Sequence, residues 1–274
     1  MDMDAYRGAE GTRPYDGAGW YYAEYRQRVS TEFILLLAAR LGWTRDERVL
    51  DLGAGPGQLA LLVAPVVADV VAIEPEPDML AEGQRRARAL GANNVTFIAA
   101  NSDDLGALRA SLGRFRTALM GQSFHWMLEK DRVLRDLGAM IDETGGSVAF
   151  VSPRRVSAPS SLEAAEQTVH EILERYLADV PLGPHPNGRH DPFEAILERS
   201  AFPRIERIER VYKAPLRPAI ESLVGSEYTI SHVLTRLGSQ REAFEREVRA
   251  ALGSLGAIGE IWLTLRDEAL IGLR

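Results

Sequence analysis

The stretch RVLDLGAGPGQLALLVAPVV, residues 48–67, decides the fold class of this chain. Its first six residues have the apolar pattern of a buried strand, glycines follow at positions 53, 55 and 57, and an apolar helical run begins at Gln58. A glycine loop between a strand and a helix lets the backbone approach a nucleotide closely. The stretch therefore predicts an α/β domain that holds a nucleotide.

The glycine loop lacks the marks of two common nucleotide sites. The dinucleotide fingerprint G-x-G-x-x-G needs a third glycine beside the pyrophosphate, but Gln58 occupies that position. No G-K-[ST] follows, which removes the P-loop. Glu74, at the end of the next strand pattern, can accept hydrogen bonds from both hydroxyls of a ribose. A ribose site without a pyrophosphate site predicts a nucleoside cofactor.

Strand and helix patterns alternate from residue 48 to residue 152, which predicts a parallel sheet covered on both faces. We expect an amphipathic helix before the first strand, with Ser30 or Thr31 as its N-cap. The expected strands cover 48–53, 69–75, 94–100, 116–122 and 146–152, and the expected helices 30–43, 58–67, 78–90 and 131–141.

The rhythm breaks after residue 152, where loops rich in Pro, Gly and His surround helix patterns near 161–177 and 192–200. An insert at the carboxyl end of a strand lies where open α/β sheets bind ligands, so residues 153–203 are predicted to form a helical lid over the substrate. Residues 1–152 form the predicted N-terminal cap and cofactor-binding core, and 204–274 complete the core within one domain. The tail patterns are strands at 205–215 and 260–274 and helices near 217–225 and 240–253.

The composition limits the classes of binding partner and the cellular compartment that we expect for this protein. A net charge of −7 offers no electrostatic footprint for nucleic acid. The chain has no cysteine, which fits a reducing compartment. Its first residues, MDMDAYRGAE, lack the basic and apolar regions of a signal peptide, and no apolar run is long enough to cross a bilayer. We therefore expect a cytoplasmic protein that binds neither nucleic acid nor membrane.

Four segments together, VLDLGAGPGQL, VVAIEPEPDML, VTFIAANSDDL and ALMGQSFHWM, resemble class I S-adenosylmethionine-dependent methyltransferases. The FHWM tetrapeptide is similar to that of the small-molecule, methyltransferase type 11-like branch. The resemblance implies a doubly wound, Rossmann-like sheet of seven strands, mostly parallel with an antiparallel last strand. It also implies S-adenosylmethionine as the cofactor and S-adenosylhomocysteine as its product.

The resemblance implies a set of cofactor-binding residues. Glu74 would hold the ribose hydroxyls, and Gln122 would lie beside the sulfonium. The methionine portion would contact Asp51, Gly53, Ala54 and Gly55, and the adenine would contact Pro75, Met79, Ser102 and Asp103.

His125 follows the fourth strand at the edge where catalytic groups of this architecture gather. Its imidazole could take a proton from an acceptor hydroxyl or amine during methyl transfer. The alternative is that His125 and Trp126 form a wall of the pocket and move no proton. Both interpretations stand on the sequence alone.

Aromatic residues gather ahead of the first core helix, at Tyr15, Trp20, Tyr21, Tyr22 and Tyr25. Such rings could cover the open edge of the site, exclude water and contact a cation or a flat acceptor. They could equally fasten the N-terminus to the outside of the fold. The candidate substrate-binding residues are Tyr21, Tyr22, Tyr25, Trp126, Ser226 and Tyr228. Ser226 and Tyr228 could equally be residues that pack the tail of the chain.

His185, His190 and Asp191 raise the question of a metal. Their spacing in a loop rich in Pro and Gly matches neither a helical ligand pair nor a zinc signature. We therefore expect no metal. His170 and His232 have no partners visible in the sequence and are expected to be solvated or packing residues.

The sequence predicts methyl transfer to oxygen or nitrogen of a small, partly apolar acceptor in natural-product metabolism. An alternative is an enzyme of the same fold that binds S-adenosylmethionine for a non-methylating reaction such as a cyclisation. A binding protein with a vestigial site would have a damaged loop, whereas Asp51, Gly53, Gly55 and Glu74 are all intact. The acceptor and the oligomeric state, including a homo-oligomer, stay open.

Overall fold

A computed structural model describes residues 13–178, 191–253 and 259–274. The chain divides into two compact units, and we describe each by itself. The sheet unit comprises Arg28–Pro153, His185–Arg210 and Asp267–Arg274, and the helical unit comprises Met1–Gln27, Arg154–Pro184 and Val211–Arg266.

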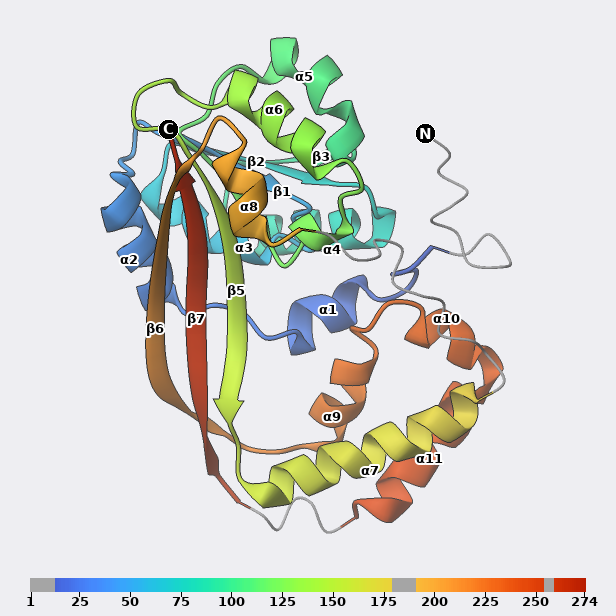
Figure 1. Cartoon of the computed structure of the whole chain (residues 1–274). Coiled ribbons are helices and arrows are strands. Elements are labelled where there is room, and N and C mark those ends of the chain that lie inside the picture. The colour runs from blue at the N-terminus through green and yellow to red at the C-terminus, as the bar shows by residue number, and fades with distance from the viewer. Residues whose placement is uncertain (1–12, 179–190, 254–258) are drawn as a thin grey trace. The chain divides into compact units, whose positions relative to one another are not determined.

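Within the described ranges the sheet has seven strands, the number that the resemblance implied, and their order is β3-β2-β1-β4-β5-β7-β6. Strands β1 to β5 pair in parallel, and the arrow of β7 runs against that of β5 (Figure 1). The order reverses direction at β1 and β4, the kind of switch point at which doubly wound sheets bind ligands. The strands are β1 (Arg48–Leu52), β2 (Asp69–Glu74), β3 (Val95–Ala99), β4 (Thr117–Gly121), β5 (Ser147–Ser157), β6 (Arg204–Leu216) and β7 (Ile261–Leu273).

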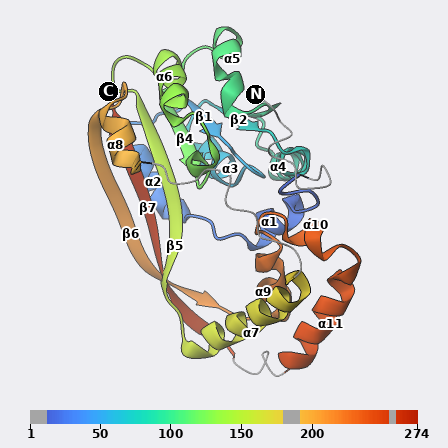
Figure 2. The ribbon, with the colours of Figure 1, turned by 45° about the vertical axis from the view of Figure 1, so that its right-hand side comes forward.

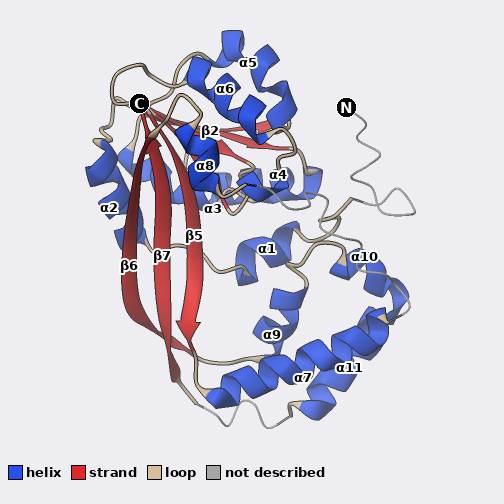
Figure 3. Ribbon diagram, viewed as in Figure 1, coloured by secondary structure: helices blue, strands red, loops and turns tan. Residues whose placement is uncertain are grey.

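Alternate residues of each strand face opposite layers of helices in the sheet unit. Val49 of β1 belongs to the core cluster on the side of α2 and α3, whereas its neighbour Leu50 belongs to the cluster on the side of α5, α6 and α8. Figure 3 shows these helices around the strands. The helices are α2 (Thr31–Leu41), α3 (Gln58–Val63), α4 (Pro77–Leu90), α5 (Leu105–Leu112), α6 (Lys130–Met140) and α8 (Phe193–Glu198).

The predicted cap of α2 is Ser30. Its hydroxyl oxygen accepts from Phe33 N at 3.2 Å, and the same hydroxyl donates to the buried Asp267 Oδ2 at 2.6 Å. Because Asp267 lies on β7, this contact fixes the start of α2 against the strand that lies between β5 and β6 in the sheet. The cap could be predicted from the sequence, but its partner 237 residues away could not.

The helical unit packs around its own apolar core. Its helices are α1 (Gly19–Tyr25), α7 (Ser160–Leu177), α9 (Ile220–Glu227), α10 (Val233–Leu237) and α11 (Arg241–Ala251), seen from a second side in Figure 2. Phe244 and Val248 of α11 and Val169 of α7 are buried in this core. No helix in the described ranges is long and apolar enough to span a membrane.

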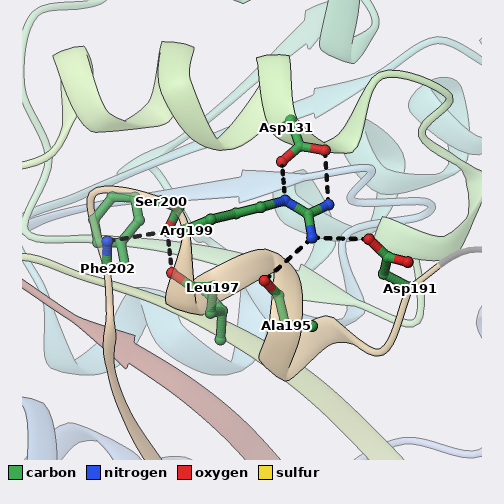
Figure 4. Close-up of polar contacts among 7 residues, drawn as sticks. All are labelled: Asp131, Asp191, Ala195, Leu197, Arg199, Ser200 and Phe202. Carbon is green, nitrogen blue, oxygen red and sulfur yellow. Dashed lines mark hydrogen bonds and ion pairs between the residues drawn. The ribbon is translucent and has the colours of Figure 1, made fainter.

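The segment predicted as a lid, residues 153–203, is divided between the two units, because α7 belongs to the helical unit and α8 to the sheet unit. Figure 4 shows how α8 is held: Arg199 donates to both carboxylate oxygens of Asp131 on α6, at 2.6 and 2.9 Å, and to Asp191 at 2.8 Å. The closing function of this segment stays a prediction.

Candidate cofactor and acceptor site

The glycine loop after β1 adopts the left-handed backbone that its sequence predicts. Gly53, Gly55 and Gly57 have φ of +70°, +56° and +75°. A Cβ on Gly53 would lie 2.5 Å from Ser123 Cβ, and one on Gly57 would lie 2.7 Å from the ring of Phe97. Packing inside the sheet unit is therefore sufficient to explain Gly53 and Gly57.

The middle glycine is joined to Glu74 at the end of β2. Gly55 N donates to Glu74 Oε2 at 2.7 Å, and Glu76 N donates to Glu74 Oε1 at 2.9 Å. Glu74 is buried, and this burial raises the pKa of its carboxyl despite the two hydrogen bonds. The two amides fix the carboxylate in one orientation and leave lone pairs on both oxygens for a ligand.

Asp51 on β1 is the second buried carboxyl. Its Oδ2 accepts from Ala60 N at 3.0 Å, while its Oδ1 has no hydrogen-bond partner among the described residues. Asp51 is 1% exposed, and burial raises its pKa from 3.8 to about 7, with the charge of Glu74 adding to the rise.

The charges of these two carboxyls determine the sign of the ligand charge that the site favours. In the part of the chain that the structure describes, no ion pair joins Asp51 or Glu74 to a cation. The negative charge of Glu74 therefore stays uncompensated and raises the pKa of Asp51. Two buried acids without a counter-ion favour a cationic ligand and oppose a pyrophosphate. The site therefore suits a cationic nucleoside, in line with the missing third glycine.

The remaining predicted cofactor residues follow β2, β3 and β4. Met79 on α4 is buried and Pro75 is exposed. Ser102 and Asp103 form a short 3-10 turn after β3, and Arg132 on α6 fixes this turn by donating to Asp103 Oδ1 at 2.8 Å. Gln122 follows β4 with φ of +51°, a conformation that side chains rarely adopt.

Two residues of the FHWM tetrapeptide are buried in the core, and the other two are half-buried. Phe124 and Met127 are buried in the core of the sheet unit, where the Phe124 ring lies 4.5 Å from that of Phe150. His125 and Trp126, in the short 3-10 turn Phe124–Trp126, are half-buried, with ring centroids 5.5 Å apart. The turn therefore presents the two side chains that were predicted to contact the acceptor.

Two residues that sequence reasoning missed hold this turn. Ser123 Oγ donates to Leu52 O at 2.6 Å, which joins the turn to the end of β1. Lys130 Nζ donates to Met127 O at 2.6 Å and lies 3.4 Å from His125 O. Ser123 carried no signal in the sequence, and Lys130 stands in the charged run EKDR, which is typical of a solvated helix start.

The predicted substrate residues outside this turn lie in the helical unit. Tyr228 is 1% exposed, its hydroxyl donates to Glu245 at 2.9 Å, and the guanidinium of Arg241 lies over the rings of Tyr21 and Tyr228. Ser226 Oγ donates to Leu223 O within its own helix. These contacts are internal to the helical unit and join α1, α9 and α11.

Tyr22 and Tyr25 also contact other residues of the helical unit. The Tyr22 ring meets that of Tyr15 edge to face at 5.9 Å. A Cβ on Gly225 would lie 2.1 Å from the Tyr25 ring, so this glycine makes room for the tyrosine. The structure brings the N-terminal aromatics together, and their contact with an acceptor stays a prediction.

No group of three or more His, Asp and Glu in the described ranges is arranged to hold a metal. His185 and His190 lie outside the described residues, and Asp191 pairs with Arg199. His170 lies 3.4 Å from Glu174 on the same helix, and burial beside Arg236 lowers the pKa of His232.

Part of the chain is similar in sequence to known methyltransferases. Residues 49–145 match a family model described as a methyltransferase domain. The chain is 32% identical over 149 residues to malonyl-[acyl-carrier protein] O-methyltransferase of Pseudescherichia vulneris, covering 54% of this chain and 55% of that enzyme. It is 32% identical over 74 residues to protein-L-isoaspartate O-methyltransferase of Dictyoglomus thermophilum, covering 27% of this chain and 34% of that protein. The chain thus spans about half of the first relative and a third of the second.

Solved structures share the fold over most of the chain. A candidate type II methyltransferase from Anaeromyxobacter dehalogenans superposes with a TM-score of 0.55 at 19% identity, covering 91% of this chain and 97% of that one. The YcgJ protein of Bacillus subtilis superposes with a TM-score of 0.51 at 15% identity, covering 89% and 99%. At these identities the similarity shows the fold alone.

Proposed function

We propose that the chain is a class I S-adenosylmethionine-dependent methyltransferase, which transfers the methyl group of this cofactor to an oxygen or nitrogen of a small, partly apolar acceptor. The sulfonium loses its charge in the reaction, the cofactor leaves as S-adenosylhomocysteine, and the acceptor loses a proton. The chemistry of the known donor thus sets the requirements: a cation-binding pocket, alignment and exclusion of water.

The observation that carries the proposal is the pair of buried carboxyls, Asp51 on β1 and Glu74 on β2. Glu74 is fixed by two backbone amides with lone pairs left for the two ribose hydroxyls. Asp51 Oδ1 is buried without a hydrogen-bond partner among the described residues, so it can accept from the ammonium of the methionine portion. The remaining cofactor contacts are proposed at Gly53, Ala54, Pro75, Met79, Ser102, Asp103 and Gln122.

The acceptor is proposed to lie beside the turn that carries His125 and Trp126. In-line displacement needs little beyond alignment, which can supply roughly 7 to 11 kcal/mol of the barrier. His125 would either take the acceptor's proton or form a wall of the pocket. Support for an oxygen acceptor comes from the two relatives named above, both of which are O-methyltransferases.

The size and setting of the acceptor are the finer part of the proposal. A net charge of −7 disfavours a nucleic acid acceptor, and the aromatic cluster of α1 suits a flat or apolar one. Specialised metabolism in the cytoplasm fits such an acceptor. The lid at 153–203 and the aromatic residues Tyr21, Tyr22 and Tyr25 are proposed to enclose it.

Calorimetric titration with S-adenosylmethionine tests the cofactor site. Glu74→Gln keeps the shape of the side chain but removes the charge behind two hydrogen bonds worth roughly 1.5 to 3 kcal/mol each, so Kd should rise by about 10² or more. Glu82→Gln is the matched control, since Glu82 is also buried but pairs with Arg85 and Arg86 on α4. Equal affinities in wild type and Glu74→Gln would contradict the ribose assignment.

A panel of hydroxyl, carboxyl and amine acceptors tests the reaction. Methyl transfer forms one S-adenosylhomocysteine for each methylated product, and mass spectrometry detects both. Turnover of an acceptor without S-adenosylhomocysteine would favour the non-methylating alternative, such as a cyclisation.

A further inference from the structure

Lys130 is a buried cation whose burial the cofactor site does not explain. It is the first residue of α6 and is 7% exposed. Its ammonium donates to Met127 O at 2.6 Å, lies 3.4 Å from His125 O, and lies 5.9 Å from the centroid of the Phe124 ring. Burial lowers the pKa of this ammonium, which shows that the position disfavours the charge.

Helix stability does not account for Lys130 either. A cation in the first turn of a helix opposes the helix dipole. Lysine is almost never buried to this degree without a paired anion, and no ion pair to Lys130 exists within the described ranges. Asp131, the adjacent carboxylate, is engaged by Arg199 instead (Figure 4).

The favourable contacts of Lys130 all lead to one segment, the turn Phe124–Met127. Phe124 and Met127 anchor this turn in the core, whereas the half-buried His125 and Trp126 lie between the anchors. The two carbonyls that face the ammonium belong to His125 and Met127, on either side of Trp126. One ammonium therefore restrains the backbone on both sides of Trp126.

We infer that Lys130 is a positioning residue, which fixes the backbone from His125 to Met127 and so orients the side chains of His125 and Trp126. That these side chains meet the acceptor rests on the proposed function. The restraint itself does not, because it is a property of the protein without cofactor or acceptor.

Fluorine NMR measures this restraint directly. The protein is labelled with 5-fluorotryptophan, and Trp126→Phe assigns the Trp126 resonance among the four tryptophans. Lys130→Met keeps the length of the side chain but loses the charge and both carbonyl contacts, so the Trp126 resonance should shift, broaden or split. Lys130→Arg keeps a cationic donor and should restore a single resonance near the wild-type position.

Arg199→Met is the matched control. It releases Asp131, the residue after Lys130, from its ion pair at the exposed side of α6 and should leave the Trp126 resonance in place. An unchanged resonance in Lys130→Met, or an equal change in Arg199→Met, would overturn the inference. If Lys130→Met does not fold, Lys130→Gln takes its place, with the same outcomes.

The cofactor titration keeps this inference separate from the proposed function. Lys130→Met should bind S-adenosylmethionine as tightly as wild type, because Lys130 contacts neither Asp51 nor Glu74. A wild-type protein without affinity for the cofactor would contradict the proposed function and leave the fluorine result standing. With an acceptor in hand, Lys130→Met should lower kcat/KM for that acceptor at unchanged cofactor affinity.

Discussion

The buried carboxyl of Asp51 makes the stability of the protein depend on pH in a direction opposite to that of most carboxylates. Its pKa is about 7 in the folded chain against 3.8 for an unperturbed aspartate. Between these values the folded state binds more protons than the unfolded state. The contribution of Asp51 to the free energy of unfolding therefore falls as pH rises from about 4 to about 7, and stays at its lower value above that range.

The size of this effect follows from the two pKa values. A difference of about 3 units at 1.36 kcal/mol per unit corresponds to roughly 4 kcal/mol. Asp51 is 1% exposed, so solvent does not screen this cost. Burial raises the pKa of Glu74 and Glu227 as well, so these carboxyls add a pH dependence of the same sign. A variant that removes only Asp51 is needed to isolate its contribution.

Asp51→Asn provides that comparison, since an amide oxygen can still accept from Ala60 N. Urea denaturation of cofactor-free wild type and Asp51→Asn, followed from pH 5 to pH 8.5, gives the difference in unfolding free energy at each pH. We expect this difference to move in favour of Asp51→Asn by roughly 2 to 3 kcal/mol across the range, because only the interval from pH 5 to about 7 contributes, at 1.36 kcal/mol per pH unit. A difference that stays constant with pH, or that moves in favour of wild type, would refute a protonated, buried Asp51.

Three further substitutions test the site. Gly55→Val should abolish binding of S-adenosylmethionine by calorimetry, because its φ of +56° disfavours a branched side chain and the cofactor is proposed to lie there; normal binding would reduce the loop to a turn. His125→Asn should leave cofactor affinity unchanged. If His125 is a general base, kcat should fall by about 10² to 10⁴ and the acidic limb of the pH–rate profile should disappear; if His125 is a wall of the pocket, only the KM for the acceptor should rise. Gln122→Gly should preserve stability in thermal melts, because glycine relieves the φ of +51°, but lower turnover; full activity would exclude a role beside the sulfonium.

The sequence predicted the sheet well because its signals are local. Buried strands read as continuous apolar runs, and the strand at 48–53 was observed as Arg48–Leu52. Strand β5 extends five residues beyond the prediction of 152, through PRRVS, where the last four residues are exposed and no apolar pattern exists. The helices Leu105–Leu112 and Val233–Leu237 were missed.

The candidate site could be predicted only where its residues lie in neighbouring segments of the sequence. The glycine loop and Glu74 lie in adjacent elements, and the structure joins them through Gly55 N. Lys130 and Ser123 were not predicted, because their roles depend on hydrogen bonds to backbone carbonyls that lie near these side chains only in the folded chain. Tyr228 stays a predicted pocket residue, and its burial and its bond to Glu245 are contacts that the sequence did not show.

At the amino edge of the sheet, polar groups satisfy one another. Arg116 donates to Leu41 O, where α2 ends, and Arg48 donates to Leu112 O, the last residue of α5, at 2.7 Å. Guanidinium groups are well placed there, because the carbonyls at the end of a helix lack partners and carry its negative dipole. These two arginines therefore contribute to the stability of this edge.

At the carboxyl edge of the same sheet, several features lower the stability of the fold. Asp51 is buried with one oxygen unpartnered among the described residues, Lys130 is buried at the wrong end of a helix dipole, and Gln122 has a left-handed backbone. Such features persist only where the surrounding structure holds them, and they gather where a ligand offsets their cost. A cation bound beside Asp51 would remove the largest of these costs, so cofactor binding should stabilise the protein most at pH values above the pKa of Asp51, where the uncompensated charge is greatest.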